Sequence, residues 1–123
     1  MRYALLIYGA PGAQTAERPT DDGVIDDWVE YTRAVKSAGA LVAVERLQVA
    51  DTATTVRLRG GERLLTDGPF IETKEHLLGF YLVEVTDLDA AIDWAARMPH
   101  IRHGSVEVRP VQPTPGVAQA ALA

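Results

Sequence analysis

The run Gly79-Phe80-Tyr81-Leu82-Val83-Glu84-Val85 decides how this chain folds. Aromatic and β-branched residues favour strands, so the run predicts a central strand of a sheet. Thr86 and Asp89 then resemble a capping box that begins a helix, which ends before Pro99. The apolar residues of this helix recur at three- and four-residue spacing: Leu88, Ala91, Ile92 and Ala95. Residues 105–111 alternate as a last strand, so this half predicts strand, helix, strand.

The N-terminal half repeats the same order. Residues 2–8 are rich in aliphatic and aromatic side chains and predict a strand, followed by a long loop over residues 9–23. A helix is expected from Asp22, with Gly39 as its stop signal. Its apolar face consists of Val24, Ile25, Trp28, Tyr31, Thr32 and Val35. Residues 41–47 then predict a second strand.

A β-hairpin is predicted between the two halves. Residues 54–59 and 63–66 alternate, and Gly60-Gly61 marks a tight turn between them. The complete order is strand, helix, strand, inserted hairpin, strand, helix, strand. This is the split βαβ order of a ferredoxin-like α+β fold with an added hairpin.

The chain is expected to form one domain that pairs with a second copy of itself. Its 123 residues include 47% hydrophobic side chains, enough for one core, which we place in residues 1–111. Residues 112–123 are rich in Pro, Gly and Ala and are expected to be a disordered tail. Two helices on one face leave the other face of the sheet uncovered. We expect Tyr3, Tyr81 and Val83 there, buried in a homodimer.

Composition argues against several classes of protein. The absence of cysteine excludes disulfides and thiolate zinc sites. A net charge of −5 without a Lys/Arg cluster argues against direct nucleic-acid binding. No run approaches the roughly 20 apolar residues of a membrane span, so we expect no membrane partner and a cytoplasmic location. The glycines lack the spacing of a nucleotide-binding loop, so no cofactor is expected.

The segment Asp67-Gly68-Pro69-Phe70-Ile71-Glu72-Thr73-Lys74-Glu75, followed by Gly79-Phe80-Tyr81, closely resembles the signature of the DGPF-type branch of the YCII-related family. The likeness extends from the opening strand to Pro110. It implies a ferredoxin-like dimer in which two sheets form an α+β barrel. Some relatives look like enzymes with a His near the first helix and an Asp before the last strand. Here no histidine precedes His76, and residues 97–104 contain no carboxylate, so that pair is missing.

The same segment supplies the candidate catalytic residues, which are Asp67, Glu72, Lys74 and Glu75. Carboxylates beside an ammonium group in a partly buried cleft are suited to general acid-base chemistry. The alternative for Asp67 is a structural turn in which Gly68 and Pro69 shape the backbone and Phe70 fills the core. The alternative for the other three is a solvated charged loop.

Three further residues are candidates for binding a ligand: Tyr81, Glu45 and Arg46. Packing is the alternative for the tyrosine and a surface ion pair for the other two. His100 and His103, together with Glu72 or Glu75, offer nitrogen and oxygen ligands for a metal, but a third nearby ligand is missing and we predict no metal site. His76 is expected to be a surface residue.

Three functions remain open at this point. The first is a cofactor-independent small-molecule enzyme or binding protein whose cleft lies near residues 67–75. The second is a regulatory interaction module linked to extracytoplasmic-function sigma factors, which the family resemblance implies. The third is a dimer whose cleft is filled by side chains.

Overall fold

The computed structural model describes residues 1–10, 22–71 and 73–122. Its elements are β1 (Arg2–Gly9), α1 (Asp22–Ser37), β2 (Leu41–Arg46), the short 3-10 turn η1 (Ala50–Thr52), β3 (Thr54–Arg59), β4 (Glu62–Asp67), β5 (His76–Glu84), α2 (Leu88–Ala96), β6 (Ser105–Pro110) and α3 (Pro115–Leu122). The predicted loop over residues 9–23 lies almost entirely outside the described residues.

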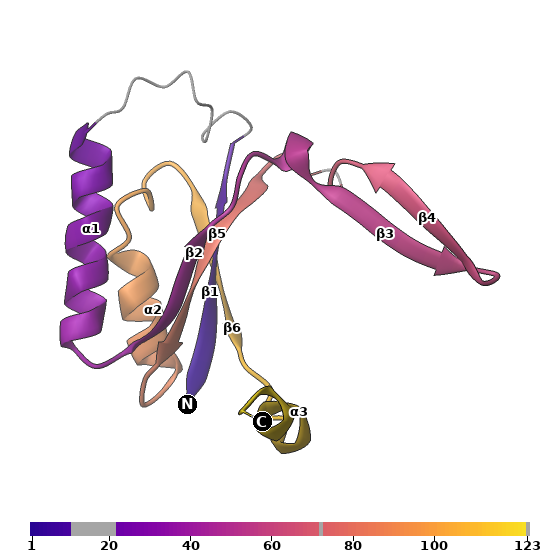
Figure 1. Cartoon of the computed structure of the whole chain (residues 1–123). Helices are drawn as coiled ribbons and strands as arrows, with labels where there is room; N and C mark the ends of the chain where they lie inside the picture. The colour runs from indigo at the N-terminus through magenta and orange to yellow at the C-terminus, as the bar shows by residue number, and fades with distance from the viewer. Residues whose placement is uncertain (11–21, 72, 123) are drawn as a thin grey trace.

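The main sheet has the strand order β2-β5-β1-β6, and every neighbouring pair is antiparallel. The run that predicted a central strand is indeed central, since β5 pairs with both β1 and β2. Helices α1 and α2 lie together on one face of this sheet (Figure 1). The chain is therefore a mixed α+β protein with the ferredoxin-like arrangement, as the sequence predicts.

The core lies between the sheet and the two helices. Alternate residues of β1, among them Leu5, are buried against α1 residues such as Val35, and Leu5 and Val35 are both fully shielded from water. Burial of each such side chain contributes about 1.5–3 kcal/mol. Tyr3, Tyr81 and Val83 belong to this core. The prediction that these three occupy the uncovered face is therefore wrong, because the strands present them to the helices.

The other face of the sheet carries the opposite set of alternating residues. Leu6 pairs with Phe80 on one side and with Glu107 on the other, and Ala4 pairs with Leu82. The side chains of Leu6, Phe80 and Leu82 are half-buried. An apolar strip along β1 and β5 therefore lies on the face that α1 and α2 do not cover (Figure 1).

Strands β3 and β4 form a separate two-stranded sheet, as predicted for the hairpin. Gly60 and Gly61 make the turn with φ angles of 57° and 81°. This left-handed conformation is rarely adopted by residues that carry a Cβ. We call residues 54–67 the arm. The arm projects away from the main sheet on the side opposite to the helices (Figure 1).

Helix ends follow ordinary capping chemistry. Gly39, with φ of 74°, donates its N–H to Lys36, and Ala40 donates to Val35, which is a Schellman motif. At the start of α2 the cap is Asp87, whose carboxylate accepts the N–H of Ala90 at 2.9 Å. The sequence places the cap at Thr86, one residue too early. Asp87, the next residue, is itself a favoured N-cap residue and accepts the N–H of Ala90.

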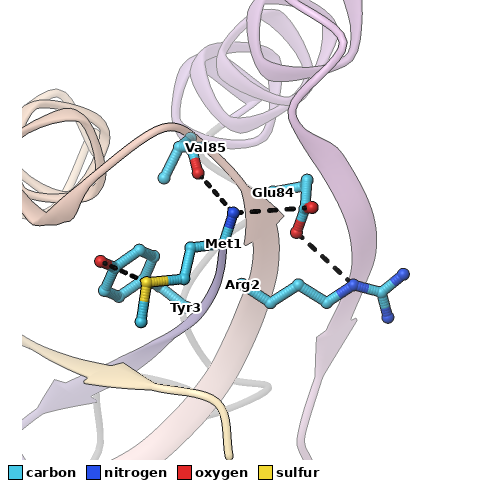
Figure 2. Close-up of polar contacts among 5 residues, drawn as sticks. All are labelled: Met1, Arg2, Tyr3, Glu84 and Val85. Carbon is cyan, nitrogen blue, oxygen red and sulfur yellow. Dashed lines mark hydrogen bonds and ion pairs between the residues drawn. The ribbon is translucent and has the colours of Figure 1, made fainter. Parts of the chain in front are cut away.

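The two ends of the described chain differ in how they are held. The N-terminal ammonium of Met1 donates to the carbonyl oxygen of Val85 at 2.8 Å, and Glu84 lies 3.6 Å from both that ammonium and the Arg2 Nε (Figure 2). The C-terminal segment forms α3, in which no residue is buried. The sequence predicts a disordered tail over residues 112–123, whereas residues 115–122 form this helix. No helix among the described residues is long and apolar enough to cross a bilayer.

Candidate functional site

An aromatic cluster joins α1 to the sheet and to α2. Trp28 of α1 stacks on Tyr81 of β5, with ring centroids 6.0 Å apart and an interplanar angle of 18°. Tyr31 makes T-shaped contacts with Trp28, Tyr81 and Trp94. These contacts follow from helical spacing, which places Trp28 and Tyr31 on the inward face of α1. These ring contacts hold α1, β5 and α2 in a fixed arrangement.

The hydroxyl groups of this cluster are already paired. Tyr31 donates to the carbonyl oxygen of Trp94 at 2.7 Å, and Thr32 donates to that of Trp28 at 2.7 Å. Because Thr32 has one hydroxyl hydrogen, the 2.6 Å contact between Thr32 Oγ1 and Tyr81 must be donated by the tyrosine. Burial raises the pKa of both Tyr31 and Tyr81. Both tyrosines are therefore neutral packing residues near pH 7.

His100 completes the cluster from the connection between α2 and β6. Its imidazole lies against Trp28, with ring centroids 5.5 Å apart. Both ring nitrogens are shielded from solvent, and neither forms a hydrogen bond of good geometry with the residues that the structure describes, although the backbone of Tyr8 and Ser105 lies close to the ring. Gly104 makes room for the ring, because a Cβ there would lie 2.6 Å from His100 Cδ2. A shielded imidazole whose hydrogen bonds are poorly formed is unusual and calls for a physical explanation.

The surroundings of His100 keep it uncharged. Burial is the largest cause and lowers its pKa below the ordinary value of 6.5. Weak hydrogen bonds to the backbone of Tyr8 and Ser105 and the negative charge of Glu75 oppose this effect in part, whereas His103 adds to it. A neutral imidazole can accept a proton, and Glu75 would favour the cation that results.

The structure places the four candidate catalytic residues differently. Asp67 ends β4, lies opposite Thr54 and is exposed, and Lys74 is exposed as well. Glu75 is half-buried at the start of β5, and its charge acts on His100. Glu72 lies outside the described residues. Glu75 is therefore the member of this set that the described structure links to another titratable side chain.

The turn that begins this segment closes the base of the arm. Gly68 has φ of 95°, its N–H donates to Ala53 at 2.7 Å, and its carbonyl accepts the Thr55 hydroxyl at 2.9 Å. Phe70 was expected to fill the core, and this is wrong. Its side chain is 65% exposed and lies under the guanidinium of Arg57, 4.9 Å from the ring centroid.

The candidate binding residues separate onto two faces of the sheet. Tyr81 faces the helices, whereas Glu45 pairs with Phe80 and so lies at the margin of the uncovered face. Arg46 lies opposite Gly79 and is exposed. The expected ion pair between Glu45 and Arg46 does not form within the described part of the chain.

His100 and His103, considered above as metal ligands, are linked through the backbone of one turn. The N–H of His103 donates to the carbonyl oxygen of His100 at 2.8 Å. Across residues 1–10, 22–71 and 73–122, no group of three or more His, Asp or Glu side chains gathers as metal ligands would.

Sequence reasoning missed the importance of His100 because its surroundings come from distant segments. The imidazole meets Trp28 of α1 and the backbone near Tyr8 of β1, and no local spacing connects these residues. One signal was available in Gly104, since a glycine at the start of a strand often marks a close approach.

Two comparisons with known proteins identify the family. The sequence model of the YCII-related domain matches residues 1–115. A protein of Rhizobium meliloti (strain 1021), described only as uncharacterised, is 40% identical over 114 residues, which span 90% of this chain and 92% of that protein. The chain therefore belongs to the YCII-related family.

Proposed function

We propose that this member of the YCII-related family is a homodimer that binds a small molecule beside His100 and Glu75 and carries out acid-base chemistry without a cofactor. One observation carries the proposal: a shielded imidazole has only poorly formed hydrogen bonds, to the backbone of Tyr8 and Ser105, among the described residues. A buried polar group with incomplete hydrogen bonds is destabilising, so it is typical of a position kept for a ligand or for proton transfer.

The chemistry of the site fits a ligand that both donates and accepts hydrogen bonds. A neutral imidazole offers one N–H and one free lone pair. The lone pair can take a proton from the ligand, and the charge of Glu75 favours the imidazolium that forms. Trp28 offers an apolar ring surface beside the imidazole. Because both nitrogens are shielded, the ligand must displace the groups that cover them.

Residues 67–75 contribute to the same proposal. Glu75 ends this segment, and the hydroxyl of Thr73 donates to its carbonyl oxygen. Asp67 and Lys74 lie on the same stretch of chain, and we assign them contacts with the polar parts of the ligand.

The homodimer rests on the uncovered face of the sheet. A protein of this size rarely leaves a contiguous apolar strip such as Leu6, Phe80 and Leu82 in contact with water. Two copies related by a twofold axis would cover both strips. We place this dimer in the cytoplasm. Light scattering at micromolar concentration should give a dimer, and a monomer alone would refute this part of the proposal.

A thermal-shift screen tests the site. The wild type and three variants, His100→Gln, Glu75→Gln and His103→Gln, are screened against a metabolite library. His103 is exposed and serves as the matched control. We expect compounds that raise the melting temperature of the wild type and of His103→Gln, with the shift lost in His100→Gln and reduced in Glu75→Gln. Shifts that survive His100→Gln would place the ligand elsewhere.

A second candidate function is an interaction module for an extracytoplasmic-function sigma factor. The observation that favours it is the exposed apolar surface of the arm, where Val56, Leu58 and Leu65 face solvent. Size-exclusion chromatography with a purified sigma factor tests it. Co-elution that Leu58→Asp abolishes would support this function, and separate elution of the two proteins would refute it.

A further inference from the structure

We infer that the arms of the two copies pack against each other across the twofold axis of the dimer, apolar face to apolar face and in opposite directions. This inference rests on the proposed homodimer and goes beyond it, because the contact between the two main sheets gives the arms no place in the assembly. The occupant of the exposed face of one arm is the arm of the second copy.

Strand pairing gathers the apolar side chains of the arm on one face. Val56 lies directly opposite Leu65, and residues directly opposite each other in an antiparallel pair share a face. Leu58 lies two residues beyond Val56 and extends this face toward the tip. The side chains of Val56, Leu58 and Leu65 are 62%, 66% and 61% exposed. We call this surface the apolar face of the arm, and its six residues are Thr54, Val56, Leu58, Arg63, Leu65 and Asp67.

The arm needs a surface to pack on. Within the described part of the chain, strands β3 and β4 pair with each other and with no strand of the main sheet. A two-stranded hairpin without further packing is marginally stable in water. A second sheet stacked on the apolar face would bury its exposed side chains and stabilise the hairpin.

The charges on the apolar face make it complementary to itself. Arg63 stands near the tip and Asp67 at the base of β4, each two residues from Leu65 and therefore on the same face. Both charged side chains are exposed, and neither forms an ion pair with another described residue. When two such faces stack in opposite directions, Arg63 of each copy meets Asp67 of the other. Opposite charges in matching positions favour this orientation over the parallel one.

The proposed dimer gives the two arms the directions that this contact requires. Each arm projects on the side of the uncovered sheet face, which in the dimer is the side of the second copy (Figure 1). A twofold axis that brings two uncovered faces together lies between the sheets and reverses the direction perpendicular to them. The two arms therefore run in opposite directions. A contact of one surface with its own copy closes at two chains.

The contact also brings a residue of the second copy to the candidate ligand segment. Asp67 ends β4 and begins residues 67–75, so Arg63 of the second copy reaches the start of that segment. A carboxylate has lone pairs for several hydrogen bonds, so an arginine on one oxygen leaves the other for the ligand contact assigned above.

Thiol cross-linking tests the contact directly, because the natural chain has no cysteine. Leu65→Cys places one thiol per chain at the centre of the stacked faces, where the twofold axis brings the two copies of this position together. Stacked sheets lie about 10 Å apart, too far for a disulfide, so a short bismaleimide joins the thiols. The matched control is Leu64→Cys, the neighbouring exposed residue on the opposite face of the same strand.

We expect a band of two-chain mass from Leu65→Cys and only background from Leu64→Cys. If light scattering shows a dimer but Leu65→Cys does not cross-link above the control, the arm contact is overturned while the homodimer proposal stands. The apolar face would then be open to a different protein, such as the sigma factor considered above. A monomer would overturn both.

Charge reversal in the Leu65→Cys protein tests the orientation of the arms. Arg63→Asp brings two carboxylates together at each end of the contact, and the added change Asp67→Arg restores opposite charges. We expect the first change to lower the cross-linking yield several-fold and the second to recover it. Arg59→Asp makes the same change of charge on the opposite face and should leave the yield unchanged. An equal loss in Arg59→Asp, or no recovery in the swapped variant, would refute the contact between Arg63 and Asp67.

Discussion

The hydroxyl of Tyr81 lies 2.6 Å from Oγ1 of Thr32, which joins the central strand β5 to helix α1 inside the aromatic cluster. Replacing Thr32 with Val keeps the shape of the side chain but leaves the Tyr81 hydroxyl without its acceptor. We expect Thr32→Val to lower the free energy of unfolding by about 1–3 kcal/mol. Urea denaturation followed by tryptophan fluorescence would measure it.

The reverse change should be milder. In Tyr81→Phe, Thr32 keeps its bond to the Trp28 carbonyl, so no donor is stranded, and we expect a loss of about 0.5–1.5 kcal/mol. The double variant should cost less than the sum of the two single changes, because both remove the same bond. Additive losses would show that this hydrogen bond does not couple α1 to β5.

The stability of the protein should depend on the protonation of His100. Burial lowers the pKa of His100 in the folded state, so below pH 6.5 the unfolded chain binds more protons than the folded chain. The free energy of unfolding should therefore fall as the pH drops below 6.5 toward the folded pKa, and this contribution should be constant at higher pH. NMR titration of the imidazole protons would give the folded pKa.

The variant His100→Gln should lose this part of the pH dependence, and the exposed control His103→Gln should retain most of it, because His103 lowers the pKa of His100 less than burial does. Equal pH profiles for His100→Gln and the wild type would contradict the assignment. So would an imidazole at position 100 that titrates at or above 6.5 in the folded protein.

Gly104 should be indispensable to the position of His100. A Cβ at Gly104 would lie 2.5 Å from the Tyr8 carbonyl oxygen and 2.6 Å from the imidazole, so Gly104→Ala must shift the ring or the strand. We expect a loss of about 1–3 kcal/mol, in the range of overpacked sites, and a changed His100 titration.

The matched control is Gly116→Ala in α3, where a Cβ meets nothing within 4 Å. In a helix this change should be neutral or stabilising by up to about 1 kcal/mol. Thermal denaturation of both variants and the wild type makes the comparison. Similar melting temperatures for Gly104→Ala and Gly116→Ala would show that the backbone around His100 yields easily.

Glu84 should contribute little, although it faces two cations at the N-terminal end of β1. The side chains of Glu84 and Arg2 are 53% and 56% exposed, so water and salt screen their attraction. We expect Glu84→Gln to cost less than about 1 kcal/mol, and added salt to remove even that difference. A larger loss that persists at high salt would mean that this ion pair is structural.

Much of the fold could be predicted from the sequence because its elements are local. Periods of two and of three to four residues defined each strand and the helices α1 and α2, and Gly39 and Gly60-Gly61 marked the chain reversals. Helix α3 was not predicted, because residues 112–123 were expected to form a disordered tail. The face assignment failed at Tyr3, Tyr81 and Val83. Alternation shows that neighbours lie on opposite faces of a sheet, but it does not show which face the helices cover.

The candidate site was predicted less well for a different reason. The segment from Asp67 to Glu75 drew attention as a group of charges, yet the effect that the structure supports is the charge of Glu75 acting on the pKa of His100. That relation depends on burial and on three-dimensional proximity, neither of which is encoded in residue spacing. Phe70 was predicted to fill the core because large aromatic residues are usually buried, but its side chain is exposed.

The point at which the arm joins the sheet has an evolutionary consequence. The arm leaves after β2 and returns into β5, and these two strands are hydrogen-bonded neighbours. The insertion therefore begins and ends at the same edge of the scaffold, and a short turn could join β2 to β5 directly. Such a segment can lengthen, shrink or change its sequence while the underlying architecture persists. Relatives with the same core are thus free to diversify in this segment.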